Sequence, residues 1–160
     1  MASIHILLVE DEKPKQTHIQ RFLDQVATDV TVSVARSVNT ALDCLEEKPS
    51  DLLLLDMSLP TFDVGERESG GRPQGFGGIE ILRHMTHAGI ACPTIVITGY
   101  EAFTQKSGQR VELAQMREEL IREFPKIFRG VLHYNSTYDE WERELAKTLQ
   151  ELGIVIGEVR

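Results

Sequence analysis

Three apolar segments of the chain each lead into side chains that could bind a metal ion or a phosphoryl group. Asp56 directly follows four leucines, and Glu10 and Asp11 follow a segment rich in isoleucine and leucine. A third apolar segment ends in Thr98, which carries a hydroxyl. Carboxylate oxygens are ligands that Mg²⁺ prefers, and a carboxylate can also act as a nucleophile. If the fold brings them together, these residues predict a site that holds Mg²⁺ and accepts a phosphoryl group.

The elements that must position these residues alternate between strands and helices. Apolar runs predict five strands, each followed by a helix with apolar residues at helical spacing, and the strands cover residues 4–9, 30–34, 52–55, 94–98 and 130–134. Five such units predict an α/β fold, a flavodoxin-like doubly wound five-stranded parallel sheet of order 2-1-3-4-5. Ligands of such sheets bind at the carboxyl edge, where the first and third strands are neighbours. These two strands end in acidic residues, so Glu10 and Asp11 should lie beside Asp56.

Several residues indicate where helices begin and end. Pro14 suits the first turn of the first helix, and Asn39 can cap the second. The sequence Thr137–Glu140 resembles a capping box at the start of the last helix, and Gly153 is expected to end that helix.

Length and composition indicate a single globular domain over residues 1–160. The chain is 41% hydrophobic and 26% charged, which is ordinary for a globular protein. Its net charge of −8 argues against nucleic acid or an anionic membrane as the main partner. The first apolar run is too short for a signal peptide or a membrane span. Cys44 and Cys92 have no metal-binding spacing, so we expect a reduced, cytoplasmic setting.

Two segments are longer than this pattern needs. Residues 61–78 are rich in glycine and charge, and residues 99–110 are polar, so both are predicted to be long loops at the carboxyl edge of the sheet. The tail, residues 153–160, could form an edge strand, a contact between two copies, or a frayed end.

The chain resembles the receiver domain of two-component response regulators. The resemblance is carried by Leu7–Glu12, Leu52–Pro60 and Pro93–Gly99, three motifs in the family's order, each at the end of an expected strand. It covers about residues 3 to 152, interrupted by the two long segments.

The resemblance implies a role for each site residue. Asp56 would accept a phosphoryl group from a histidine kinase or a histidine phosphotransfer protein. Glu10, Asp11, Asp56 and the main-chain carbonyl of Ser58 would bind Mg²⁺ or Mn²⁺, and Thr98 would donate its hydroxyl to a phosphoryl oxygen. Such a protein catalyses only its own phosphorylation and dephosphorylation and is not an enzyme in the turnover sense.

The chain departs from the family at the fifth strand. Receiver domains end this strand with a lysine that binds the phosphoryl group, and here that position falls on Tyr134. The family's switch aromatic, three residues earlier, falls on Val131. Lys106 or Lys126 could substitute for the lysine. The resemblance also implies that the positions of Ser58 and Tyr100 tune the attack of water on the acyl phosphate.

Fewer than ten residues follow the last expected helix, so we expect a stand-alone receiver that signals through an unknown downstream protein. Two other classes remain open. A pseudo-receiver, which binds partners without being phosphorylated, is favoured by the missing lysine and disfavoured by the three acids. A phosphohydrolase with an aspartate nucleophile would need a second aspartate at position 58, where this chain has serine.

Overall fold

A computed structural model of the chain describes residues 3–60, 77–99, 102–104 and 110–154. Five parallel strands form its main sheet, in the order β2-β1-β3-β4-β7. These strands are β1 (Ile4–Val9), β2 (Val30–Ala35), β3 (Leu52–Leu55), β4 (Thr94–Thr98) and β7 (Phe128–His133). Counted along the chain within this sheet, the order is 2-1-3-4-5, which confirms the predicted flavodoxin-like topology.

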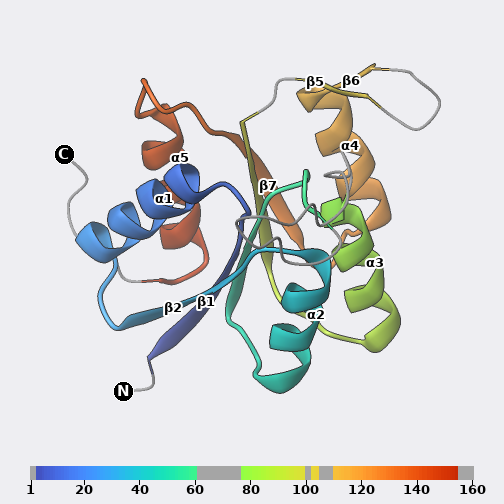
Figure 1. Cartoon of the computed structure of the whole chain (residues 1–160), viewed down its shortest axis with the longest axis horizontal. Helices are drawn as coiled ribbons and strands as arrows, with labels where there is room; N and C mark the ends of the chain where they lie inside the picture. Colours follow the sequence, from blue (N-terminus) through green and yellow to red (C-terminus); the bar gives the residue numbers. More distant parts are fainter. Residues whose placement is uncertain (1–2, 61–76, 100–101, 105–109, 155–160) are drawn as a thin grey trace, which may run out of the picture.

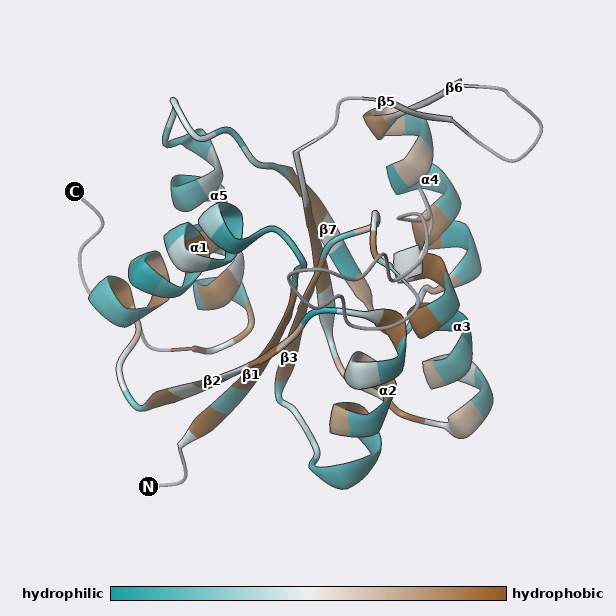
Figure 2. Cartoon of the chain, in the orientation of Figure 1, coloured by the Kyte–Doolittle hydropathy of each residue, from teal (hydrophilic) through white to brown (hydrophobic). Residues whose placement is uncertain are grey.

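Helices cover both faces of the sheet (Figure 1). They are α1 (Lys13–Val26), α2 (Val38–Glu47), α3 (Gly77–Ala88), α4 (Leu113–Glu123) and α5 (Glu140–Glu151). One core packs α1 and α5 against the sheet, and a second core packs α2, α3 and α4 against the other face. Figure 2 shows apolar residues along the strands and on helix sides. No helix among the described residues is long and apolar enough to cross a membrane.

The four leucines of β3 form the centre of the molecule. Each is completely buried, and their side chains alternate between the two cores. A central parallel strand is covered on both faces, which is why this segment is apolar without interruption. The strand therefore holds the residue that follows it, Asp56, in a fixed place at the carboxyl edge.

The fifth strand of the sheet differs slightly from the prediction. β7 begins at Phe128 and ends at His133, rather than covering residues 130–134. Tyr134 lies one residue beyond the strand, but its N–H still donates to the carbonyl of Thr98 at 2.7 Å. This hydrogen bond holds the backbone of Tyr134 against the end of β4.

Two helix starts were predicted incorrectly. Ser37, not Asn39, caps α2, because its Oγ accepts a hydrogen bond from the N–H of Thr40 at 3.2 Å. Asp139 precedes α5, and its side chain makes no capping hydrogen bond with the residues that the structure describes. The N–H of Thr137 instead donates to Asn135 Oδ1 at 2.7 Å, so the predicted capping box does not form.

The start of α1 and the end of α5 agree with the predictions from the sequence. Pro14 lies in the first turn of α1, where the absence of an N–H does not interrupt the helix. Gly153 follows α5 with φ of +83°, a conformation that favours glycine. The next residue, Ile154, is buried, and residues 155–160 of the predicted tail lie outside the described part of the chain.

The two predicted loops have different outcomes. Part of the segment 99–110 is not a loop, because β5 (Ala102–Thr104) pairs antiparallel with β6 (Arg110–Glu112). This ribbon satisfies its backbone groups by pairing, without the apolar pattern that would reveal a strand in the sequence. Residues 61–76 of the other loop lie outside the described residues, and Gly77 and Gly78 belong to α3.

Candidate functional site

Three acids meet at the carboxyl edge of the sheet. Val9 and Leu55 are paired in register, so the residues that follow β1 and β3 emerge side by side. Glu10, Asp11 and Asp56 each offer a carboxylate oxygen, and these atoms lie within 4.8 Å of one another. Glu10 and Asp56 are buried and Asp11 is half-buried. The parallel pairing of β1 with β3 thus produces the cluster that the topology predicts.

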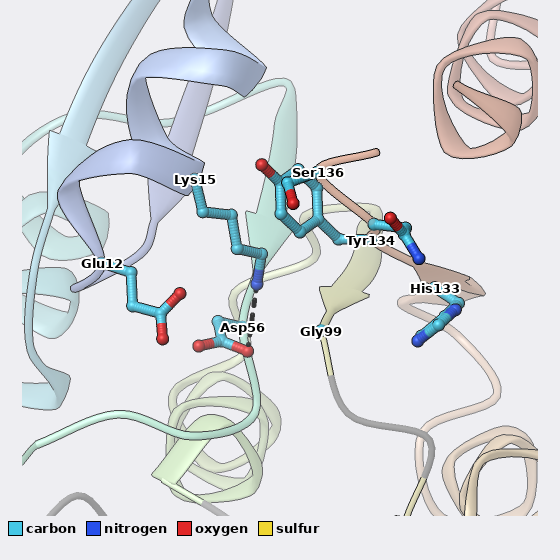
Figure 3. A pocket seen from close by; sticks show the side chains of 8 residues that line it. Glu12, Lys15, Asp56, Gly99, His133, Tyr134 and Ser136 are labelled. Atoms are coloured by element: carbon cyan, nitrogen blue, oxygen red, sulfur yellow. Dashed lines mark ion pairs between the residues drawn. The ribbon is translucent and has the colours of Figure 1, made fainter. Parts of the chain in front are cut away.

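A buried lysine completes this cluster, and the sequence reasoning missed it. The Nζ of Lys15 lies 2.6 Å from Glu10 Oε1 and 3.4 Å from Asp56 Oδ1. It also donates to the carbonyl of Ile97 at 2.8 Å. The side chain is only 3% exposed and runs from the first turn of α1 to Asp56 (Figure 3).

Burial dominates the electrostatics of the acids. It raises the pKa of Glu10 to about 7, with a further rise from the charge of Asp56, while Lys15 opposes the shift. Burial also raises the pKa of Asp56 to about 6, again against the effect of Lys15. The pKa of Asp11 is raised by burial as well. For Lys15, burial alone would lower the pKa, but Asp56 and Glu10 outweigh it and the pKa is raised.

The carboxylate of Asp56 has an unsatisfied atom. Asp56 Oδ1 is buried and makes no hydrogen bond with any described residue, although it lies in ion-pair contact with Lys15. A buried acceptor without a hydrogen bond is costly, so a bound cation would stabilise this oxygen. Three carboxylates beside one ammonium group also leave an excess of negative charge. Both features fit a small divalent cation with oxygen ligands, such as Mg²⁺.

A pocket of about 470 Å³ opens beside Asp56. The residues after β7 form one wall, Gly99 after β4 lies next to them, and α1 contributes the opposite wall (Figure 3). The lining residues are Glu12, Lys15, Asp56, Gly99, His133, Tyr134, Asn135 and Ser136. The pocket therefore gives the Asp56 carboxylate an opening toward solvent.

Tyr134 occupies the position where the family has its lysine. Its hydroxyl lies 2.9 Å from His18 Nδ1 on α1, and its ring centroid lies 5.7 Å from the Nζ of Lys15. The ring also packs against Trp141 of α5, with centroids 5.3 Å apart. Tyr134 thus joins β7 to α1 and α5, and its hydroxyl is directed away from Asp56 (Figure 3).

The remaining predicted site residues have different placements. Thr98 is completely buried at the end of β4, and Ser58 is half-buried two residues after Asp56. Tyr100 lies outside the described residues, as does Lys106.

The suggestion that Lys126 replaces the missing lysine is wrong. Lys126 is exposed and precedes β7, so it lies at the opposite edge of the sheet from Asp56. The sequence does contain a signal for Lys15, which is spaced from Ile19 and Phe22 so as to fall on the buried face of α1. A lysine on an apolar helix face needs a buried partner, and two acids lie just ahead of it in the chain.

Comparisons with known proteins agree with this geometry. Residues 6–117 match the family model described as the response regulator receiver domain. The chain is 26% identical over 149 residues to the Detocs response regulatory protein DtcB of Enterobacter cloacae, covering 92% of this chain and 99% of that protein.

Solved structures share the fold. The phosphorylated cyanobacterial phytochrome response regulator RcpA has a TM-score of 0.65 and 17% identity, with 98% of this chain and 100% of that chain covered. A chain in the complex of the CheA3 P1 domain with CheY6 from R. sphaeroides has a TM-score of 0.61 and 23% identity, covering 96% and 98%. At these identities the similarity concerns the fold alone.

Proposed function

The chain belongs to the response regulator receiver family, and we propose that it accepts a phosphoryl group on Asp56 and passes the signal to a partner protein. The observation that carries this proposal is the state of Asp56. It directly follows the central strand, faces an open pocket, lies beside two further acids, and has an oxygen without a hydrogen bond among the described residues.

The donor would be a phosphohistidine of a histidine kinase or of a histidine phosphotransfer protein. A carboxylate oxygen of Asp56 forms a bond to phosphorus while the bond between phosphorus and the histidine nitrogen breaks, and that nitrogen keeps the electron pair. Asp56 needs no general base, because with a pKa of about 6 it is mostly ionised at neutral pH. The transition state of such a transfer is loose, so the protein contributes mainly positioning and charge neutralisation.

Glu10, Asp11 and Asp56 would hold Mg²⁺ or Mn²⁺, with the main-chain carbonyl of Ser58 as a further ligand implied by the family resemblance. When bound, the ion supplies positive charge that offsets the negative charge of the phosphoryl oxygens. Thr98 would donate its hydroxyl to one of these oxygens. The three acids fit this role because hard oxygen donors match a hard divalent cation.

Intact-mass measurement after incubation with acetyl phosphate and Mg²⁺ tests the proposal. The wild-type protein should gain the mass of one phosphoryl group, and Asp56→Asn should gain none. Asp51→Asn is the matched control, because Asp51 lies at the other end of β3 and accepts a hydrogen bond from the N–H of His5 that asparagine can also accept. An adduct that persists at full yield in Asp56→Asn would contradict the assignment.

The pseudo-receiver is a second candidate, and the absence of lysine from the position of Tyr134 is the observation that favours it. The same experiment separates the two candidates. A wild-type protein that gains no adduct from acetyl phosphate or a phosphorylated kinase domain would be a pseudo-receiver. Rapid release of phosphate over many turnovers, without a persistent adduct, would instead indicate a phosphohydrolase.

A further inference from the structure

We propose that Lys15 of α1 is the residue that pairs with the phosphoryl group on Asp56, in place of the lysine that the family carries at the end of the fifth strand. This inference rests on the proposed function. It follows from the position of the Lys15 ammonium group, which is buried, lines the pocket and lies 3.4 Å from the carboxylate that would react.

The contacts of Lys15 leave one donor for this task. An ammonium group has three N–H donors. One is used by Glu10 Oε1 at 2.6 Å and one by the carbonyl of Ile97 at 2.8 Å. These two partners fix the position of Nζ, and the third contact is with Asp56 Oδ1, an atom without a hydrogen bond among the described residues. The remaining donor is therefore next to the carboxylate that would carry the phosphoryl group.

Burying an ammonium group is expensive, so its presence here requires an explanation. A leucine or methionine on this face of α1 would pack into the core without any cost of desolvation. The chain instead places a cation within reach of Glu10 and Asp56. Phosphorylation would add further negative charge at this point, and Lys15 is already in place to neutralise part of it.

Tyr134 explains why the cation lies on α1 and not at the end of the fifth strand of the sheet. A lysine at this position after β7 would bring a second ammonium group close to Lys15, since the Tyr134 ring centroid lies only 5.7 Å from Nζ. Like charges at such a distance repel, and burial strengthens the repulsion. The aromatic ring instead offers its π-face to the cation, and its hydroxyl is held by His18. The cation on α1 and the aromatic ring after β7 thus fit one another.

The decisive experiment moves the lysine charge from position 15 to position 134. Four proteins are compared with wild type: Lys15→Met, Lys15→Arg, the double variant Lys15→Met with Tyr134→Lys, and Lys13→Met. Lys13 is the matched control, because it lies two residues away on α1 and is exposed. The readouts are adduct yield and lifetime with acetyl phosphate and Mg²⁺, affinity for the phosphoryl mimic beryllofluoride, and affinity for Mg²⁺ alone.

We expect Lys15→Met to bind beryllofluoride roughly ten- to a hundredfold more weakly, because it loses one charge-assisted hydrogen bond. Its affinity for Mg²⁺ alone should be unchanged or higher. Tyr134→Lys should restore most of the loss in the double variant, a result that a purely structural role for Lys15 would not produce. Lys15→Arg should retain an intermediate affinity, and Lys13→Met should behave as wild type.

Other results would overturn the inference in distinguishable ways. If the wild-type protein forms no adduct and binds no beryllofluoride, both the proposed function and this inference are contradicted. An adduct that depends on Asp56 but has full yield and lifetime in Lys15→Met leaves the function standing and removes the role of Lys15. A Lys15→Met protein with more adduct and tighter Mg²⁺ binding would show that Lys15 blocks the site.

A measurement on the wild-type protein covers the case in which Lys15→Met does not fold. The ε-methylene resonance of Lys15, assigned by its loss in Lys15→Arg, should shift when beryllofluoride binds in the presence of Mg²⁺. If this resonance stays in place while those of Asp56 and its neighbours move, Lys15 does not contact the phosphoryl group.

Discussion

Glu10 and Asp56 are two buried acids that share a single buried lysine. Their pKa values of about 7 and about 6 mean that each holds its proton more tightly in the folded chain than in the unfolded chain. Burial is the main cause in both, and the ion pairs with Lys15 do not fully offset it. In the absence of a divalent cation, ionisation of this pair therefore works against folding.

The metal-free protein should lose stability as the pH rises from 5 to 8. Across this range the folded state binds more protons than the unfolded state, so the free energy of unfolding falls with increasing pH. We expect a loss of about 1 to 3 kcal/mol, measured by urea denaturation in EDTA. Glu10→Gln should flatten the part of the profile near pH 7. Stability that rose over this range in wild type would contradict the assignment of raised pKa values.

The acids could be predicted from the sequence, because each directly follows an apolar strand and parallel strands end at the same edge. Lys15 was harder to predict, because its role depends on how the first turn of α1 is oriented relative to β3. The contacts of Lys15 with Asp56 and with the Tyr134 ring join residues that are far apart in the sequence. The sequence shows only that Tyr134 stands where a lysine is expected and that Lys15 falls on an apolar helix face.

At the scale of elements, the start of α3 packs tightly against the backbone of residues 56–59. A Cβ atom added to Gly78 would lie 2.7 Å from the carbonyl oxygen of Asp56 and 2.8 Å from the side chain of Met57. At Gly77 it would lie 2.8 Å from the carbonyl oxygen of Leu59. The start of this helix can therefore reach the backbone behind Asp56 only because two consecutive residues lack side chains.

We expect Gly78→Ala to destabilise the protein by about 1–3 kcal/mol and to lower the yield of phosphorylation. Alanine is the better helix former by about 1 kcal/mol, so a net loss would demonstrate that close packing outweighs helix propensity. Gly130→Ala is the control, because an added Cβ there meets no described atom within 4 Å. Thermal unfolding and intact mass give the two readouts, and a more stable Gly78→Ala protein would refute the packing argument.

At this scale the sequence predicts the strands of the main sheet better than the ribbon of β5 and β6. The central strands β1, β3 and β4 follow from near-continuous apolar runs, because each is covered on both faces. The ribbon of β5 and β6 has no such pattern and was predicted as a loop. The start of α2 was misplaced by two residues, since Ser37 and Asn39 are both good capping residues and only the local backbone decides between them.

The whole molecule is divided by its sheet into two cores, and the site belongs to one side more than the other. His18 and Trp141 connect α1 and α5 on one face, and Tyr134 joins them to the end of β7. On the opposite face, Val131 stands half-buried where the family has its switch aromatic. A change at Asp56 therefore has a direct route through side chains to the face formed by α1 and α5.

Hydrogen exchange with and without beryllofluoride should reveal this asymmetry. We expect new protection to concentrate in α1, the start of α5 and residues 133–136, with smaller changes in α4. The added charge would shift Lys15 and Tyr134, which contact these elements. The Asp56→Asn protein, treated in the same way, provides the baseline. Changes confined to α3 and α4 would show that the signal leaves through the other face.

The leucine strand has a further consequence before the protein is folded. Four consecutive leucines form a segment that can self-associate in the unfolded chain, and such segments are commonly flanked by charged gatekeeper residues. Here the flanking charges are Asp51 and Asp56. We therefore expect Asp56 to be one of two charges that limit aggregation of the newly made chain. Replacing Asp56 with an uncharged residue should therefore lower the soluble yield, whereas Asp56→Glu should preserve it.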